Sequence, residues 1–436
     1  MRRLAVLSLH TSPLAQPGQG DSGGMNVYVR ELVSALAQAG VQADVFTRRW
    51  EDGPEIVEVE PGFRVVHVEA GPLDLPKEQL PGIVDEFADG VRDHLADLGD
   101  VDALHANYWL SGVAGHRLKH ELDLPLVSTF HTLARVKAET GDPEPDARVR
   151  AEAAVIGCSD AILANCVAEA DQLERLYGAD PRRIELVHPG VDHAFFSPGD
   201  RGGARFALQQ VLDSRPGEGP DRAAPEGQHF ASGRLAQGLG SVELGDGPVL
   251  LFVGRIQPLK GLDVAVRALA ALRRPDATLV VVGGASGAEG SAEVERIDKL
   301  IAELGVADQI RLVEPVPHHL LSTYYRAADV VLVPSRSESF GLVALEAAAC
   351  GTPVVAAAVG GLRTLVEHGH TGFLVDGRHP QAFADFTREI LDDPQLAARL
   401  SATAARRARD YTWSTAAARL RRVYADLTTR ALVDCR

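Results

Sequence analysis

The strongest constraint on the fold is a repeated alternation of short apolar runs with longer stretches of helical periodicity. In the first half of the chain, the composition of buried strands is found at residues 4–9, 44–48, 64–69, 103–105, 126–129, 161–164 and 184–188. Several of these runs are apolar throughout, as expected for strands that are covered on both faces. Strands that alternate with helices form parallel sheets, so the pattern predicts a doubly wound α/β domain.

The alternation stops at residues 203–245, which are rich in Gly, Pro, Ala, Arg and Gln and show only one short helical stretch near residues 206–212. We interpret this segment as a flexible linker or insertion. The pattern then restarts, with expected strands at residues 249–253, 279–282, 310–313, 330–333 and 354–357. The predicted domains are therefore residues 1–202 and 246–412, followed by a segment, residues 413–436, whose helix could pack back on the first domain.

Composition supports two domains and excludes two classes of partner. The chain has 436 residues, of which 45% are hydrophobic, so it can fill two cores. Its formal net charge of −16 argues against nucleic acid and anionic membranes as partners. The apolar run at the N-terminus is too short for a membrane span and leads into a glycine-rich loop, so we interpret it as a strand. We expect a cytoplasmic protein.

The cysteines predict neither a metal site nor a disulfide framework. No two of them have the close spacing of metal ligands, and four in a chain of this length are not the framework of a small secreted domain. Unpaired thiols in a reducing cytosol are the simplest interpretation of Cys158, Cys166, Cys350 and Cys435.

Two loops that follow predicted strands suit phosphate groups. Residues 10–26 place four glycines before a helix, an arrangement that can bind phosphate but also occurs in ordinary turns. Residues 254–261 carry Arg255 and Lys260, five positions apart. Such cations can neutralise the diphosphate that leaves a nucleotide-sugar donor, and the alternative is a solvated surface loop. Parallel sheets bind ligands at the carboxyl ends of their strands, so we expect a cleft between the two domains to be the active site.

Carboxylates and histidines occupy similar positions. Residues 334–341 open a helix and contain Glu338, and Glu346 follows in an apolar stretch of that helix, where its carboxylate needs a partner. Both carboxylates can accept hydrogen bonds from sugar and ribose hydroxyls. His10 and His131 end predicted strands, so ligand contacts are favoured over purely structural roles. Neither has Cys or His at metal-ligand spacing, so no zinc site is predicted there.

These features resemble the retaining glycosyltransferases of the GT-B fold, which share a Glu-x7-Glu motif, an Arg–Lys loop and two Rossmann-like domains. The resemblance covers nearly the whole chain outside residues 203–245. More narrowly, D-inositol 3-phosphate glycosyltransferases of mycothiol biosynthesis are similar in the runs HTSPL, GDSGGMNVY, KEQLP, YWLSG, HTLARVK and GRIQPLKG. The resemblance implies transfer of N-acetylglucosamine from UDP-GlcNAc to 1D-myo-inositol 3-phosphate with retention, by a homodimer.

The resemblance also implies roles for individual residues. Catalysis would fall to Arg255, Lys260, Glu338 and His131. Donor binding would involve the same two cations and Glu338, together with Gln16, Pro17, Gly24 and Glu346. The acceptor would be bordered by His10, Asp21, Ser22, Gly23 and Asn26, and its phosphate would be held by Lys77, Tyr108, Thr132 and Arg148. A magnesium ion would be matched by Tyr325, Arg326, Ala328 and Thr352, although the chemistry needs no metal once the two cations are present.

The sequence departs from the family pattern at several positions. Val316 stands where an arginine often lies near the uracil, and Asn107 replaces a histidine beside Tyr108. The insertion at residues 203–245 is longer than usual, and the segment between Lys137 and Arg148 is shorter.

No carboxylate is placed as a nucleophile for double displacement, so attack on the face that the leaving group departs from is the predicted mechanism. Three alternatives stay open. They are a related enzyme with another nucleotide-sugar donor and a different cyclitol, sugar-phosphate or natural-product acceptor, a phosphorylase that uses pyridoxal phosphate, and a sugar-binding protein without catalysis.

Overall fold

The computed structural model describes residues 2–18, 20–99, 101–213, 244, 246–286 and 290–435, and the chain divides into two compact units. Unit 1 comprises Met1–Ala15, Gly24–Gly190 and Tyr411–Arg436, and unit 2 comprises Gln16–Gly23 and Val191–Asp410. Residues 16–23, which the sequence places in the N-terminal domain, therefore group with unit 2. In the predicted insertion, residues 203–213 are helical, and residues 214–243 and 245 lie outside the described residues.

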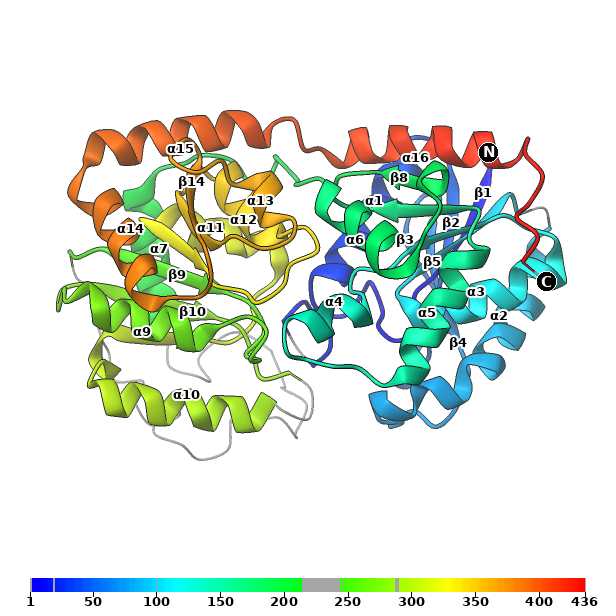
Figure 1. The fold of residues 1–436 in the computed structure, drawn as a ribbon, viewed down its shortest axis with the longest axis horizontal. Coiled ribbons are helices and arrows are strands. Elements are labelled where there is room, and N and C mark those ends of the chain that lie inside the picture. The colour runs from blue at the N-terminus through cyan, green and yellow to red at the C-terminus, as the bar shows by residue number, and fades with distance from the viewer. Residues whose placement is uncertain are drawn as a thin grey trace. The chain divides into compact units, whose positions relative to one another are not determined.

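Unit 1 is built on an eight-stranded sheet with the order β3-β4-β2-β1-β5-β6-β7-β8 (Figure 1). Its strands pair in parallel, except that β3 is antiparallel to β4. The strands are β1 (Arg3–Leu7), β2 (Gln42–Arg48), β3 (Ile56–Glu60), β4 (Phe63–Val68), β5 (Ala103–Asn107), β6 (Leu126–Thr129), β7 (Ala161–Ala164) and β8 (Ile184–Leu186). The helices are α1 (Gly24–Gln38), η1 (Lys77–Ile83), α2 (Val84–Leu98), α3 (Trp109–Leu122), α4 (Ala134–Glu139), α5 (Asp146–Cys158), α6 (Val167–Tyr177), η2 (Pro181–Arg183) and α16 (Trp413–Leu427).

Unit 2 is built on a six-stranded parallel sheet with the order β11-β10-β9-β12-β13-β14. The strands are β9 (Val249–Val253), β10 (Thr278–Val282), β11 (Ile310–Val313), β12 (Val330–Val333), β13 (Val354–Ala357) and β14 (Gly372–Val375). The helices are α7 (Arg201–Asp213), α9 (Leu262–Leu272), α10 (Gly290–Leu304), η3 (Ala307–Gln309), η4 (His318–Leu320), α11 (Leu321–Ala327), α12 (Leu342–Ala349), α13 (Leu362–Leu365), α14 (Pro380–Asp392) and α15 (Pro394–Ala408).

The predicted α/β architecture is confirmed in both units. Each predicted strand is present, with ends that differ by no more than two residues. The sequence did not reveal β3 or β14. Strand β3 lies at the edge of its sheet and carries glutamates at alternate positions, and β14 also lies at an edge and begins with glycine. Both therefore lack the continuous apolar run of a central strand.

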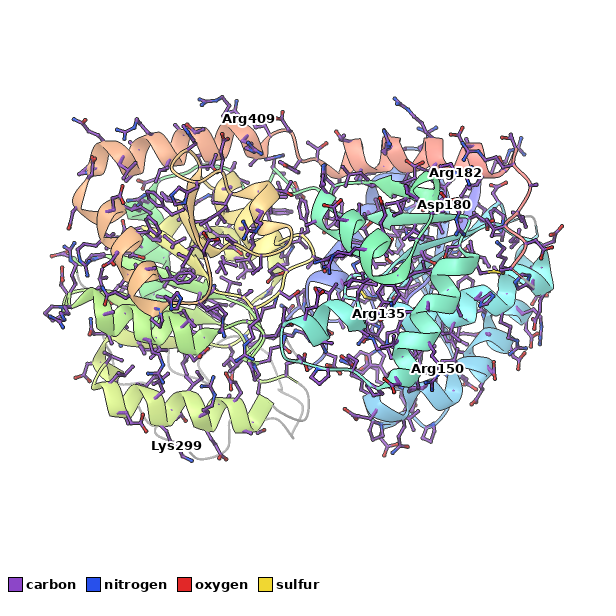
Figure 2. All side chains as sticks on the ribbon, in the orientation of Figure 1. Arg135, Arg150, Asp180, Arg182, Lys299 and Arg409 are labelled. Carbon is purple, nitrogen blue, oxygen red and sulfur yellow. A yellow bond between two sulfur atoms is a disulfide. The ribbon has the colours of Figure 1, made fainter. Side chains whose placement is uncertain are left out.

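Charged side chains lie on the surface of each unit. Arg150, Lys299 and Arg409 are exposed and project away from the ribbon (Figure 2). Asp180 and Arg182 form an ion pair of 2.8 Å ahead of β8. Among the described residues, no helix combines the length and the apolar character needed to cross a bilayer.

The structure corrects the prediction of four unpaired thiols. Cys158, at the end of α5, is joined in a disulfide to Cys435, and their Cα atoms lie 5.4 Å apart. The two cysteines are separated by 277 positions in the sequence, so only the fold could reveal that they meet. Cys166 and Cys350 are buried elsewhere.

The last helix completes unit 1. Helix α16 packs against α1, and the Tyr424 hydroxyl lies 2.7 Å from Nδ1 of His105 in β5. The chain leaves unit 1 after Gly190 and re-enters it at Tyr411. The two crossing segments touch, because a Cβ atom on Gly190 would lie only 2.1 Å from the backbone nitrogen of Trp413. No side chain fits at Gly190 without moving one of the segments.

We predict that Gly190→Ala lowers the stability of unit 1 by about 2–3 kcal/mol, because the added methyl group forces two backbones apart. The melting temperature of the variant, measured by calorimetry, should fall by several degrees. Gly157→Ala is the matched control: Gly157 lies in α5, is exposed and has open space where a Cβ would be. It should melt at the wild-type temperature or slightly above it. Equal melting temperatures for the two variants would contradict the tight crossing.

Candidate active site

Two of the predicted loops leave the same edge of the unit 2 sheet. Strands β9 and β12 are hydrogen-bonded neighbours in parallel, so the loops that follow them begin side by side. The backbone N–H of Arg336 in one loop donates to the carbonyl of Leu259 in the other at 2.8 Å. Gly261 has φ of 78°, and a Cβ atom there would lie 2.4 Å from the carbonyl oxygen of Pro334. Glycine at this position therefore lets the two loops form one continuous surface.

Lys260 and Glu338 meet on this surface. The Lys260 Nζ atom lies 2.5 Å from Oε1 of Glu338, and the Ser335 hydroxyl donates to the same oxygen at 2.9 Å. The backbone of Glu338 is also held, because its carbonyl accepts the N–H of Gly361 at 3.0 Å. The Lys260 side chain is 25% exposed and the Glu338 side chain 16%. Both side chains are therefore accessible from outside, and their contact with a ligand stays a prediction.

Arg255 is oriented by two oxygens. Its Nη1 atom donates to the Ser286 hydroxyl at 3.2 Å and to the backbone carbonyl of Asp21 at 3.3 Å. Gly23 packs against the same guanidinium, with 3.3 Å between the position of an added Cβ and Arg255 Nε. Two predicted acceptor residues thus contact a predicted donor residue within unit 2. Ser286 was not predicted, although it lies in the glycine-rich segment that follows β10.

The rest of the loop 16–23 is tied to unit 2 through its backbone and one amide. The Gln16 side chain donates to the backbone carbonyl of Val316 at 2.5 Å and to that of Pro17 at 3.4 Å. The Gly18 N–H donates to the carbonyl of Ser22 at 2.9 Å. Val316 stands where the family often has an arginine, and here its backbone carbonyl accepts the hydrogen bond from Gln16.

Glu346 has the partners that its apolar surroundings require. It is 5% exposed, and its Oε1 lies 2.7 Å from His318 Nε2 while its Oε2 accepts the Tyr325 hydroxyl at 2.7 Å. Burial, together with the nearby Glu346 carboxylate, raises the pKa of Tyr325 well above its usual value, so the phenol stays a donor. The sequence did not point to His318, because nothing in its own segment predicts a contact with α12.

The four residues matched to a magnesium ion fit one poorly. The Tyr325 carbonyl accepts the Thr352 hydroxyl at 2.6 Å and the Ala328 N–H at 3.2 Å. The Arg326 guanidinium donates to the backbone carbonyls of residues 195 and 197. Magnesium prefers at least one carboxylate and near-octahedral geometry. This group offers only neutral oxygens and brings a permanent cation, so we derive no chemical step through a metal.

Unit 1 brings together three of the residues predicted to hold the acceptor phosphate. Arg148 donates to the Thr132 hydroxyl at 3.1 Å and to the Tyr108 hydroxyl at 3.2 Å. Its guanidinium also pairs with Glu152 at 2.8 Å and with Glu144 at 2.9 Å. Burial opposes the charge, but Tyr108 and the two carboxylates outweigh it and raise the pKa of Arg148. The cation is thus fixed in place before any ligand arrives.

The other predicted acceptor residues of unit 1 are His10, Asn26 and Lys77, which lie on three separate segments. The His10 ring centroid lies 4.2 Å from that of Tyr108. Asn26 donates to the Thr11 hydroxyl at 2.6 Å and so orders the loop after β1. Lys77 is exposed at the first residue of η1. Gly24, predicted to offer its amide to the donor phosphate, is the first residue of α1.

His131 is held as a neutral imidazole. Burial, together with the nearby His105, lowers its pKa to about 3. Its Nε2 lies 2.9 Å from Asn107 Oδ1, so a protonated Nε2 donates there and Nδ1 is the acceptor nitrogen. His131 has φ of 61°, a left-handed conformation that is uncommon for non-glycine residues and costs energy. Asn107, noted only as a departure from the family, thus orients a predicted catalytic residue.

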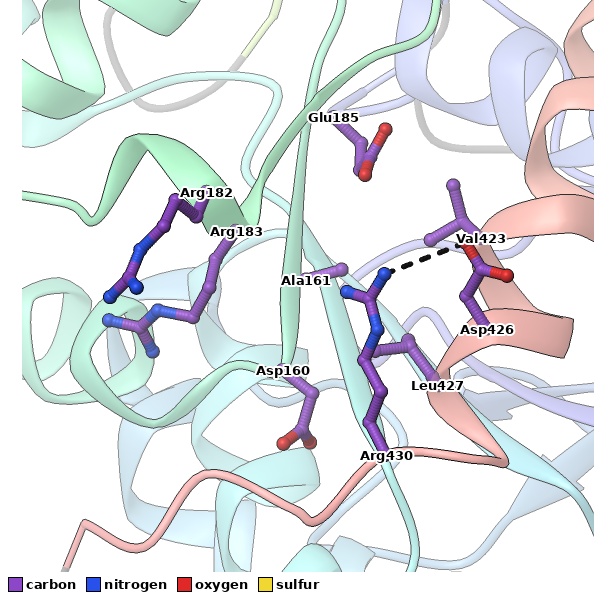
Figure 3. Close-up of a pocket in the computed structure, with 9 residues that line it drawn as sticks. All are labelled: Asp160, Ala161, Arg182, Arg183, Glu185, Val423, Asp426, Leu427 and Arg430. Atoms are coloured by element: carbon purple, nitrogen blue, oxygen red, sulfur yellow. Dashed lines mark ion pairs between the residues drawn. The ribbon is translucent and has the colours of Figure 1, made fainter.

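A pocket elsewhere on unit 1 contains none of the predicted site residues (Figure 3). Its charges balance, since Arg182, Arg183 and Arg430 lie with Asp160, Glu185 and Asp426. Arg430 pairs with Asp426 at 3.6 Å. A pocket of mixed charge gives no reason to expect an anionic substrate there.

Comparison with known proteins assigns both halves of the chain. Residues 22–195 match the family model "Glycosyltransferase Family 4", and residues 241–407 match "Glycosyl transferases group 1". The D-inositol 3-phosphate glycosyltransferase of Thermobispora bispora is 45% identical, over 99% of this chain and 96% of that protein. The protein of the same name from Xylanimonas cellulosilytica is 46% identical, over 98% and 97% respectively.

Solved structures agree with this assignment. Sucrose-phosphate synthase from Thermosynechococcus elongatus superposes with a TM-score of 0.84 and 31% identity, covering 98% of this chain and 99% of that one. Anabaena Alr3699/HepE in complex with UDP-glucose has a TM-score of 0.73 at 20% identity, covering 98% and 100%, and shares the fold. The chain is thus a glycosyltransferase of the GT-B fold, and it belongs to the family of D-inositol 3-phosphate glycosyltransferases.

Proposed function

We propose that this enzyme transfers N-acetylglucosamine from UDP-GlcNAc to 1D-myo-inositol 3-phosphate with retention of configuration. The observation that carries the acceptor half is the Arg148 cluster in unit 1. Arg148 has two carboxylate partners but also faces two hydroxyls, those of Thr132 and Tyr108. A phosphate can accept hydrogen bonds from all three groups at once. The names of the relatives support a phosphorylated inositol as the acceptor.

The donor half rests on unit 2. Arg255 and Lys260 are the cations predicted for the diphosphate, and Lys260 is paired with Glu338 at 2.5 Å. A bound donor would separate that pair, since its diphosphate competes for Lys260 while a sugar hydroxyl donates to Glu338. The exchange costs little, because a partly exposed ion pair contributes only about 0–1 kcal/mol.

The proposed reaction is attack by an inositol hydroxyl on the same face of the sugar that UDP leaves. The departing diphosphate oxygen takes the proton of that hydroxyl. Arg255 and Lys260 stabilise the charge that develops on the leaving group. The neutral His131 would contact the transferred sugar through a hydrogen bond.

Three further properties are part of this proposal. The enzyme acts in the cytoplasm, forms a homodimer and needs no metal ion for its chemistry. The poor fit of Tyr325, Arg326, Ala328 and Thr352 to magnesium supports the last of these. Turnover that is unchanged after treatment with a chelator would agree with it.

We predict that Lys260→Ala lowers kcat by about 100-fold or more, because the diphosphate loses a cation that acts mainly in the transition state. UDP release in the presence of inositol 3-phosphate measures the effect. Lys299→Ala is the matched control, since Lys299 is exposed on α10 (Figure 2). The control should retain wild-type kcat, and both variants should melt like the wild type. Near-normal turnover by Lys260→Ala would refute the proposed role.

We predict that the acceptor phosphate is required. Replacing inositol 3-phosphate with inositol should lower kcat/KM by at least about 100-fold, since several charge-assisted hydrogen bonds are lost. Lys77→Ala should lower kcat/KM for the phosphorylated acceptor and leave that for inositol unchanged. Arg150→Ala, an exposed charge on α5, is the control and should change neither value. Equal use of the two acceptors, or a preference for a hexose phosphate, would overturn the acceptor assignment.

A further inference from the structure

Unit 1 contains a second cluster of chemically capable side chains, which the proposed reaction does not use. His116 and His120 lie four positions apart on α3 and therefore share one face of the helix. Cys158 is the last residue of α5, and Cys435 lies in the segment that follows α16. One ligand atom from each of the four residues can be chosen such that all lie within 4.8 Å of one another.

The spacing of these atoms is close to that around a tetrahedral ion. His120 Nε2 lies 3.2 Å from Cys435 Sγ and 3.3 Å from Cys158 Sγ, and His116 Nε2 lies 3.7 Å from Cys435 Sγ. Zinc bonds of about 2.3 Å to sulfur and about 2.0 Å to nitrogen give nitrogen–sulfur edges of about 3.5 Å. The two sulfurs are bonded to each other here, so a thiol reductant must first supply two electrons and two protons to cleave the S–S bond. The freed sulfurs would then separate to about 3.8 Å. A Cα separation of 5.4 Å allows this by side-chain rotation.

Contacts that do not involve sulfur hold the two cysteines beside α3. Lys119 lies between the two histidines in the sequence, and its side chain is buried. Its Nζ atom donates to the Cys158 carbonyl at 2.8 Å. It also pairs with Asp160 at 2.8 Å. Asp160 in turn accepts the backbone N–H of Val433 at 2.7 Å, and its carboxylate points toward the C-terminal segment (Figure 3). The scaffold therefore places Cys435 at the cluster whether or not a disulfide forms.

The chemistry of the donor set selects the ion. Two thiolates and two neutral imidazoles are a familiar ligand set for zinc, and the two thiolate charges balance Zn²⁺. Binding would release one proton from each thiol and involves no electron transfer.

We propose that unit 1 holds a structural zinc ion on His116, His120, Cys158 and Cys435. Four protein ligands leave no open position for substrate, so the ion would act on structure and not on catalysis. It would fasten the C-terminal segment to α3 and α5. A disulfide between Cys158 and Cys435 is the competing state, since bonded sulfurs cannot serve as thiolate ligands.

The test measures bound metal in the full-length protein, purified from a zinc-supplemented culture in the presence of a thiol reductant. The wild type should contain about one zinc per chain, and exchange with Co²⁺ should give the thiolate charge-transfer and tetrahedral ligand-field bands. Cys435→Ser changes an exposed residue of the C-terminal segment, so the fold should persist. Its zinc affinity should fall by more than about 100-fold.

Two controls separate this site from other thiols and histidines. Cys166→Ser removes a buried thiol outside the cluster and should leave the zinc content at about one per chain. His120→Asn should lose zinc as Cys435→Ser does. The proposal fails if the reduced wild type binds neither zinc nor cobalt, or if Cys435→Ser binds as much as the wild type. It also fails if alkylation and mass analysis show that the disulfide persists under reducing conditions. These readouts do not depend on transferase activity.

Discussion

The parallel pairing of β9 with β12 is the constraint on which the donor side of the site depends. Because parallel neighbours end at the same edge, the loops that follow these strands begin side by side. Backbone contacts at Leu259 and Gly261 join the two loops. The Lys260–Glu338 ion pair lies on the surface that these two loops form, and the backbone contacts hold the loops together without it. A partly exposed ion pair contributes little to folding. Because the sheet stabilises the fold, Lys260 and Glu338 can exchange each other for a ligand as hydrogen-bond partners.

Most of the fold and much of the site could be predicted, because both follow from local patterns. Apolar runs identify central strands, and the rule that ligands bind at carboxyl ends identifies the loops that carry Arg255, Lys260 and Glu338. The features that the sequence did not predict depend on tertiary packing. His318 reaches Glu346 from a different segment, and nothing near it in the sequence predicts that contact. The edge strands β3 and β14 were not predicted, because glutamates interrupt the apolar pattern of β3 and β14 begins with glycine.

Residues that depart from a family pattern, or that no motif includes, proved informative once the fold was known. Asn107 orients His131, a role that its position at the end of β5 could have suggested. The cysteines show the opposite limit. Cys158 and Cys435 meet across 277 positions, so no spacing rule could pair them. His116 and His120 lie four residues apart on α3, and this pair points to a metal site only beside the two sulfurs.

The chain leaves unit 1 after Gly190 and returns to it at Tyr411, so most of unit 2 is an insertion within unit 1. Helix α16, which packs on α1 and bonds to His105, is therefore synthesised after the whole of unit 2. A nascent chain can complete unit 2 first, because that unit ends at Asp410. Although its synthesis begins earlier, unit 1 cannot complete its fold until α16 has been made, and until then α16 does not cover α1. A truncated product that stops shortly before residue 411 would thus contain a finished second unit attached to an unfinished first one.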